Sequence, residues 1–259
     1  MPALDDPAAA ADPRSYAMRL AGDLDTLLGG ALAAAYLHGS AALGGWLADR
    51  SDVDILFVVS DDLPGEAARA GGLLTRSGLR CPGRGLEASI VTMSQAARPA
   101  PPWPFVLHVG LGDGGKTLVR GDAMPGDPDL LMHYAVCRVA GIAVAGPSPT
   151  ALIGAVQRSQ ILAYLAGELA WGLANAPENY AVLNACRALV YLDDGRIVSK
   201  IEGGLIALNR GIGPPGVVRR ALDQQQARGP ARAAGKDAIL FVRESAAALS
   251  AAAEAAGRT

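Results

Sequence analysis

Cysteine and long apolar runs are both scarce in this sequence. The three cysteines, at positions 81, 137 and 186, form no Cys-x-x-Cys pair, and no histidine stands at ligand spacing from them. This pattern argues against a disulfide framework and against a structural zinc site. The longest apolar stretch, residues 130–145, is interrupted by His133 and Arg138, and the first residues show no basic and apolar leader pattern. We therefore expect a cytoplasmic protein with no membrane partner.

Charged and aromatic residues are also few, at 19% and 5% of the 259 residues, while hydrophobic residues make up 51%. A chain with this much apolar material and so little charge folds rather than staying disordered. The 23 basic and 25 acidic residues leave a formal net charge of -2, which argues against a main partner that is a nucleic acid held through its phosphates. A small partner is expected instead.

Alanine and glycine are abundant, with 51 and 32 residues, and the alanines concentrate in helical patterns toward the C-terminus. Apolar runs predict strands, and helical spacing with capping signals predicts helices. The expected strands are 33–37, 53–59 and 86–93, the expected early helices are 14–28, 64–77 and 127–141, and 94–104 is expected to be loop. Only helices are expected later, at 150–174, 180–193, 199–210, 215–228 and 237–256. We predict an α+β fold: a catalytic domain with a mixed sheet and flanking helices in residues 1–148, and a helical bundle in residues 149–259.

Two carboxylates stand at the beginning of the apolar segment Ile55 to Val59. Side chains at i and i+2 of a strand share a face, so Asp52 and Asp54 are expected to project together. Two adjacent carboxylates at a buried strand repel each other unless a cation lies between them, and hard oxygen ligands favour Mg²⁺. Upstream, Gly39 allows close backbone approach to a phosphate, and Ser40 offers a hydroxyl donor.

Glu87 is conspicuous because the sequence has only seven glutamates and this one interrupts the expected strand 86–93. Each motif has a simpler structural interpretation when taken alone. A Gly-Ser pair is commonly a turn, Asp-x-Asp is often a solvated loop, and a glutamate in a strand usually faces water. Their order along the chain makes the functional interpretation much stronger.

That order, Gly-Ser, then Ser-Asp-x-Asp on a strand, then an acid on a later strand, resembles the nucleotidyltransferase superfamily related to DNA polymerase beta. The segment GSAALGGWLADRSDVDILFVV, the later LEASIV and the helical C-terminal half are similar to the bacterial streptomycin/spectinomycin adenylyltransferases. The resemblance implies transfer of AMP from ATP to a hydroxyl of an aminoglycoside or aminocyclitol antibiotic, with release of pyrophosphate.

The resemblance also implies roles for individual residues. Asp52 and Asp54 correspond to the aspartates that hold two magnesium ions, Glu87 to the catalytic base, and Ser40, beside Gly39, to the serine that contacts the ATP triphosphate. The segment NACRALVYLDDGRIVSK matches the stretch in which an Arg and a Lys reach the phosphates, which implies that role for Arg187 and Lys200. Their alternative interpretation is a solvated helix charge and a partner of a helix dipole.

The acceptor is expected to be a small cationic antibiotic, with spectinomycin favoured over streptomycin. Members that take streptomycin have a Trp and an acid at places that fall near Leu111 and Leu173 here. Glu178 lies beside another acid position of the drug site and is a candidate substrate-binding residue. The alternatives are a nucleotidyltransferase for another metabolite, a protein or an RNA end, and a non-catalytic nucleotide-binding relative. We expect a monomer.

Four further residues receive no functional role from the sequence. His38 is interpreted as a packed residue at the end of a strand, and His108 and His133 have no evident partner. Trp103, among prolines, is either a cleft-lining ring or a loop anchor.

Overall fold

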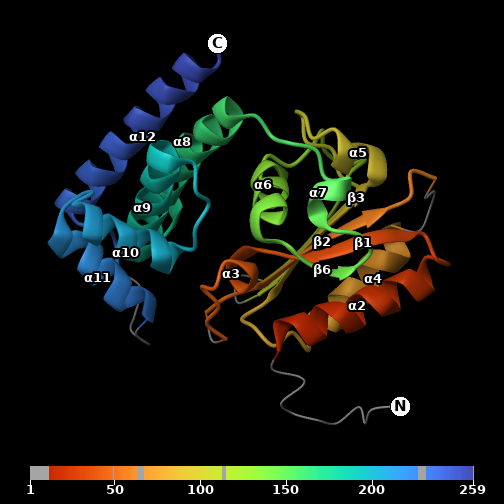
Figure 1. Ribbon diagram of the computed structural model, residues 1–259. Coiled ribbons are helices and arrows are strands. Elements are labelled where there is room, and N and C mark those ends of the chain that lie inside the picture. Colours follow the sequence, from red (N-terminus) through yellow and green to blue (C-terminus); the bar gives the residue numbers. More distant parts are fainter. Residues whose placement is uncertain (1–11, 49, 63–66, 113–114, 227–231, 259) are drawn as a thin grey trace. The chain divides into compact units, whose positions relative to one another are not determined.

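The computed structural model describes residues 12–48, 50–62, 67–112, 115–226 and 232–258 (Figure 1). The chain forms two compact units, Met1–Val156 and Gln157–Thr259. The division falls between two helices of the C-terminal half, α7 (Pro149–Leu152) and α8 (Arg158–Asn175).

The first unit is built on a six-stranded mixed sheet with the strand order β5-β4-β3-β2-β1-β6. Only β2 and β3 pair in parallel, and every other neighbouring pair is antiparallel. The strands are β1 (Leu32–Leu37), β2 (Val53–Val59), β3 (Leu86–Thr92), β4 (Leu107–Gly112), β5 (Gly115–Arg120) and β6 (Ile142–Ala145).

Helices cover both faces of this sheet (Figure 1). On one face lie α2 (Pro13–Leu27) and α4 (Ala67–Gly78), and on the other lie α5 (Met93–Ala97), α6 (Leu130–Ala140) and α7. A short helix, α3 (Gly39–Ala42), follows β1. The main core includes Ile55 and Phe57 of β2 beneath α2. Because side chains alternate along a strand, Asp54 points to the opposite face.

The first helix shows how local sequence sets an element. Asp12 caps α2 by accepting hydrogen bonds from the backbone N–H groups of Arg14 and Ser15, and Pro13 occupies the first turn, where its missing N–H costs nothing. Leu20 and Leu24 recur at helical spacing and are buried against the sheet.

The second unit contains only helices in its described residues. They are α8, α9 (Glu178–Asp194), α10 (Lys200–Arg210), α11 (Pro215–Gln226) and α12 (Lys236–Ala256). Helix α9 is largely buried and packs against α10 at a glycine, because a Cβ added to Gly203 would lie 2.8 Å from Cβ of Arg187. Gly195 ends α9 in the left-handed conformation, with φ of 78°.

The predicted α+β class, with a mixed sheet and a helical C-terminal half, is confirmed. The expected strand 53–59 is found with the same bounds, whereas β4, β5 and β6 were not predicted. Strand β5 is mostly exposed and shows no apolar alternation. Strand β4 does alternate, but two of its six residues are glycines, which are depleted in strands. Strand β6 is only four residues long and continues the apolar run of α6.

The expectation of loop over 94–104 is wrong at its beginning, where α5 forms. Its cap is a reciprocal pair: the Gln95 backbone N–H donates to the Thr92 hydroxyl, and the Gln95 side chain accepts from the Thr92 backbone N–H.

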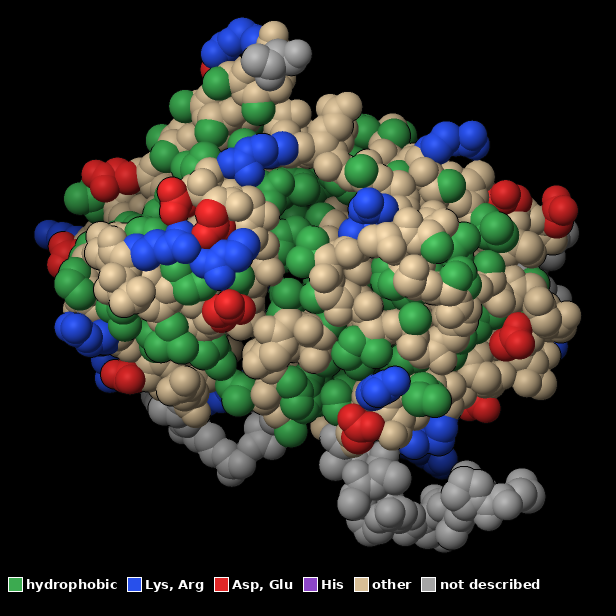
Figure 2. Space-filling view, viewed as in Figure 1, with side chains coloured by type: hydrophobic (Ala, Val, Ile, Leu, Met, Phe, Trp, Pro, Cys, Tyr) green, Lys and Arg blue, Asp and Glu red, His purple; other side chains and the backbone are tan. Residues whose placement is uncertain are grey.

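The surface shows no dominant charge on the face drawn in Figure 2, where acidic and basic side chains lie interspersed. This agrees with the formal net charge of -2. No described helix is both long and apolar enough to cross a lipid bilayer.

Candidate active site

The parallel pairing of β2 and β3 brings two of the predicted site carboxylates together. Asp54 and Glu87 are register partners in this ladder. Neighbouring residues of a sheet that are paired in register point to the same face, which here is the face opposite α2 and α4. Residues 33 positions apart in the sequence thus place their carboxylates side by side.

Gly39 packs directly against Asp54. It has φ of 60°, and a Cβ added to it would lie 1.8 Å from Oδ2 of Asp54, so a side chain at this position would displace the Asp54 carboxylate. The preceding residue, His38, donates its backbone N–H to the Asp54 carbonyl oxygen at 2.9 Å. These contacts bring Gly39 to Asp54, and the half-buried Ser40 follows Gly39 in α3.

Asp52, immediately before β2, has a guanidinium partner. Nη2 of Arg84 lies 3.0 Å from Oδ2 of Asp52, and Nε lies 3.3 Å from Oδ1. Both side chains are partly exposed, 48% for Arg84 and 29% for Asp52. A cation that binds Asp52 therefore competes with Arg84.

Imidazoles surround Glu87, and all three histidines of the sequence take part. Nε2 of His133, from α6, lies 3.3 Å from Oε1 of Glu87. The ring of His38 lies against His133, with 4.8 Å between ring centroids. His108 of β4 shares a 3.0 Å hydrogen bond between Nδ1 and the hydroxyl of Ser89, two residues beyond Glu87 on β3.

The electrostatics of this cluster favour a charged Glu87–His133 pair beside a neutral His38 ring. Burial alone would raise the pKa of Glu87, but the hydrogen bond with His133 and the positive charge of the histidines hold it well below its usual range. Burial would lower the pKa of His133, but the same hydrogen bond and the Glu87 charge raise it to about 8. Burial, followed by the charge of His133, lowers the pKa of His38 to about 3.

Arg187 and Lys200 both act on one tyrosine of the second unit. Lys200 begins α10, and its Nζ lies 4.3 Å from the centroid of the Tyr180 ring. The Tyr180 hydroxyl donates to Oε1 of Glu168 at 2.5 Å. Burial and this hydrogen bond raise the pKa of Tyr180, and the charge of Arg187 opposes that rise. The two cations assigned to phosphate therefore act on the same ring.

Glu178 has internal partners. Its side chain is 8% exposed, its Oε2 accepts the backbone N–H of Gly235 at 2.9 Å, and its Oε1 lies 3.4 Å from Nη2 of Arg220. These contacts give the carboxylate a structural explanation of its own, and its role in substrate binding stays a prediction.

The comparisons with known proteins follow the same two units. Residues 17–80 match the nucleotidyltransferase domain, and residues 155–227 match the C-terminal domain of aminoglycoside adenylyltransferase. The chain belongs to the aminoglycoside adenylyltransferase family. It is a nucleotidyltransferase of the adenylyltransferase type, as predicted. The first match includes Gly39, Ser40, Asp52 and Asp54, the second includes Arg187 and Lys200, and Glu87 lies outside both.

A solved structure shows the same fold at low sequence identity. The spectinomycin adenyltransferase AAD(9) from Enterococcus faecialis, solved with ATP and spectinomycin, is 17% identical, with a TM-score of 0.66 over 90% of this chain and 98% of that one. CdnC of E. coli MS115-1, in its HORMA-deltaN complex, is 17% identical with a TM-score of 0.31, over 98% of this chain and 85% of that one. That second likeness is too weak to support an argument. No curated protein sequence matches the chain.

Sequence reasoning identified Glu87 for this adenylyltransferase but missed His133. The available signal was an imidazole inside the mostly apolar helix Leu130–Ala140. A buried polar side chain in such a helix usually has a hydrogen-bond partner from another element. Here that partner lies on β3, which sequence spacing does not reveal.

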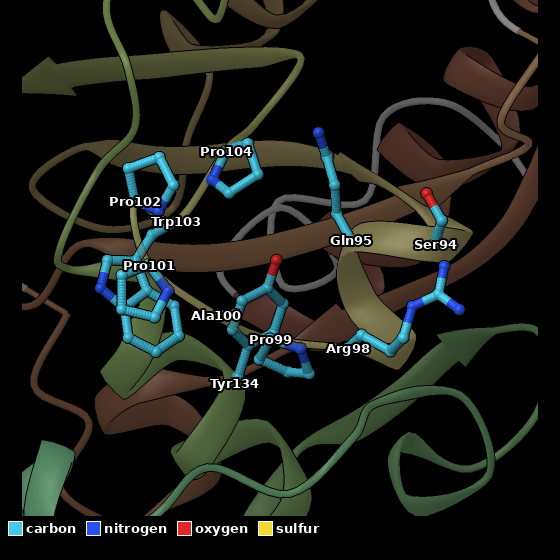
Figure 3. A pocket seen from close by; sticks show the side chains of 10 residues that line it. All are labelled: Ser94, Gln95, Arg98, Pro99, Ala100, Pro101, Pro102, Trp103, Pro104 and Tyr134. Carbon is cyan, nitrogen blue, oxygen red and sulfur yellow. The ribbon is translucent and has the colours of Figure 1, made fainter.

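A separate hollow of about 230 Å³ lies where α5 and the proline-rich segment meet Tyr134 of α6 (Figure 3). Trp103 lines it, is 7% exposed and has φ of 65°. Its backbone N–H donates to Ala100 and its carbonyl accepts from Asp127, so Trp103 anchors the loop as well as lining the hollow. Ser94, which lines the hollow on its α5 side, shares a hydrogen bond with the Thr92 hydroxyl.

Proposed function

We propose that this protein transfers AMP from ATP to a hydroxyl of an aminocyclitol antibiotic, with spectinomycin favoured over streptomycin, and releases pyrophosphate. The observation that carries the proposal is the registered pair of Asp54 and Glu87, with Gly39 packed against Asp54. Family membership supports the AMP transfer, and the fold shared with a spectinomycin adenyltransferase supports the acceptor.

The roles of the residues follow from their chemistry. Glu87 is anionic and 37% exposed, so it is able to accept a proton from an acceptor hydroxyl beside it. Ser40 and the backbone at Gly39 donate to phosphate oxygens. Arg187 and Lys200 are the candidate cationic partners of the ATP phosphates. The protein mainly positions its two substrates and neutralises charge.

The carboxylates of Asp52 and Asp54 fit a magnesium-dependent reaction. No group of three or more His, Cys, Asp or Glu side chains among the described residues is arranged to hold a metal ion. Magnesium is usually held by only one or two carboxylates together with substrate phosphates, and hard carboxylate oxygens are its preferred donors. Asp52 and Asp54 would hold it, which requires Arg84 to release Asp52. Magnesium bound there would offset the negative charge of the reacting phosphates.

A cationic acceptor suits the acids of this chain. Glu87 supplies a negative charge at the reacting hydroxyl, and Glu178 is the second acid that we propose for the acceptor. Asp193 and Asp194 are less suited, because both are paired with Arg210. The expected monomeric state, cytoplasmic location and independence of nucleic acid stay predictions from the sequence.

The test is mass spectrometry of spectinomycin and streptomycin after incubation with the protein, ATP and magnesium. We expect spectinomycin to gain the mass of one adenylyl group, and streptomycin to gain it more slowly or not at all. Omission of magnesium is the matched control. Pyrophosphate release with a different acceptor, and no gain on either drug, would contradict the proposed substrate.

A further inference from the structure

His133 is the one imidazole in direct contact with the Glu87 carboxylate. We infer that His133 is a positioning residue: it donates from Nε2 to Oε1 of Glu87, and so presents Oε2 to the acceptor hydroxyl. This inference rests on the proposed function, because it takes Glu87 as the base of AMP transfer.

The contact is asymmetric, as a positioning interaction requires. The side chain of His133 is 14% exposed and that of Glu87 is 37% exposed. The imidazole is thus the more buried partner, and the Glu87 side chain keeps more of its surface accessible.

The ring of His133 has little freedom to turn away. Leu131 and Tyr134, on either side of it in α6, are buried, and the helix fixes where its Cβ points. His38 packs against the ring on its other side. A side chain held in this way passes its orientation to its hydrogen-bond partner.

On the β4 side, Glu87 is paired with a residue that has no side chain. The register partner of Glu87 on β4 is Gly110, which has no side chain to cover the carboxylate. A Cβ added to Gly110 would come no closer than 3.7 Å to a neighbouring atom, here Nε2 of His108 or Cβ of Thr117. Gly110 therefore adds no side chain of its own over Glu87, and His108 and Thr117 border this position.

The transfer replaces one bond at the α-phosphorus of ATP with another. The acceptor oxygen forms a bond to the α-phosphorus of ATP, and the bond from that phosphorus to the bridging oxygen breaks. The electron pair leaves with pyrophosphate, and the hydroxyl proton moves to Oε2 of Glu87. The hydrogen bond from His133 stays on Oε1 throughout and prevents the carboxylate from rotating away from the proton.

The other titratable groups around His133 come from several elements. Burial lowers the pKa of His133, while Glu87, Asp54 and Asp129 raise it. His133 in turn lowers the pKa of the neighbouring His38. The inference depends on the donated hydrogen bond and not on the charge of the ring.

Two substitutions of similar polarity test the hydrogen bond. The amide nitrogen of Gln occupies the place of imidazole Nε2, whereas that of Asn matches Nδ1 and falls short of Glu87. We expect His133→Gln to keep kcat within about threefold of wild type, and His133→Asn to lose about 30-fold, because small misplacement of a reacting group is costly. KM for ATP should change less than about twofold in both variants.

The matched control is Val139→Ala, an exposed position of the same helix. A double-mutant cycle with Glu87→Gln then separates positioning from general damage, since residues that act as a unit are not additive. We expect His133→Asn to cause no further loss in the Glu87→Gln background. Equal losses in both backgrounds, or equal kcat for the Gln and Asn variants, would overturn the inference.

A measurement on the substrate-free protein distinguishes failure of the positioning role of His133 from failure of the proposed function. We expect the Nε2 proton of His133 to be visible by NMR as a hydrogen-bonded signal, and to shift strongly in Glu87→Gln. An absent or unshifted signal overturns the positioning role. If the signal behaves as expected but the wild type transfers no AMP, the proposed function fails and the inference fails with it.

Discussion

Arg84 holds both carboxylate oxygens of Asp52, with Nη2 3.0 Å from Oδ2 and Nε 3.3 Å from Oδ1. The carboxylate that the family resemblance assigns to magnesium thus already has a cation beside it. Because both side chains are partly exposed, the ion pair contributes little net free energy. A metal ion that binds Asp52 is therefore able to displace Arg84.

Removal of this competitor should strengthen metal binding. We expect Arg84→Gln to bind Mn²⁺, measured by electron paramagnetic resonance without nucleotide, about two- to fivefold more tightly than wild type, as an exposed ion pair is worth ~0.2–1 kcal/mol. Arg120→Gln, which breaks the exposed Arg120–Asp122 pair, is the matched control. Unchanged or weaker Mn²⁺ binding in Arg84→Gln would count against a metal at Asp52.

The contact between Gly39 and Asp54 predicts a loss of activity that exceeds the loss of stability. In Gly39→Ala the new Cβ displaces the Asp54 carboxylate, and the residue must also keep a positive φ, which costs about 1 kcal/mol. We expect kcat/KM to fall at least about 100-fold. Gly29 has a similar φ of +64° with open space around it, so Gly29→Ala should lower stability without lowering activity. Similar activities of the two variants would refute the close-approach role of Gly39.

The Glu87–His133 pair predicts how stability depends on pH. The pKa of His133 is raised from 6.5 to about 8, so the folded state holds the proton more tightly than the unfolded state does. Its contribution is fully present below pH ~6.5 and is lost as pH rises toward 8 and beyond. Denaturant unfolding should therefore show wild type losing stability over this range and Glu87→Gln losing less. Parallel pH profiles for the two proteins would contradict the pair.

The buried contacts of Glu178 predict a structural cost. We expect Glu178→Gln to lower the free energy of unfolding by about 1–3 kcal/mol, because a carboxylate that accepts from Gly235 and pairs with Arg220 is replaced by a weaker acceptor. Glu244→Gln, an exposed position of α12, is the control. Thermal or denaturant unfolding measures both, and an unchanged stability of Glu178→Gln would contradict the structural account of this residue.

The parts of the site that the sequence predicted are formed by residues close together in the chain or by a clear apolar strand pattern. Strand β2 has a continuous apolar run, and the residues around Gly39 and Asp54 lie only 15 positions apart, so their proximity follows from a strand-turn-strand unit. The resemblance to a known family supplied Glu87, Arg187 and Lys200, which spacing alone does not connect to the aspartates.

What the sequence did not reveal depends on long-range packing. The partner of Glu87 is His133, 46 positions further along and on a helix, and no periodicity links the two. The Arg84–Asp52 pair likewise depends on how the segment before β3 meets the segment before β2. Strand β5 is stabilised by its pairing with β4 rather than by a pattern of its own, which is why sequence patterns missed it. The alternation of β4 is short and contains two glycines, which weakens it as a strand signal.

The most direct test of the central claim is the rate at which the α-phosphate of labelled ATP appears on spectinomycin in a single turnover, compared between wild type and Glu87→Gln. If the Asp54–Glu87 pair is the catalytic centre, wild type transfers the label with release of pyrophosphate, and Glu87→Gln transfers it at least about 100-fold more slowly with unchanged ATP binding. Equal transfer rates for the two proteins would contradict the account.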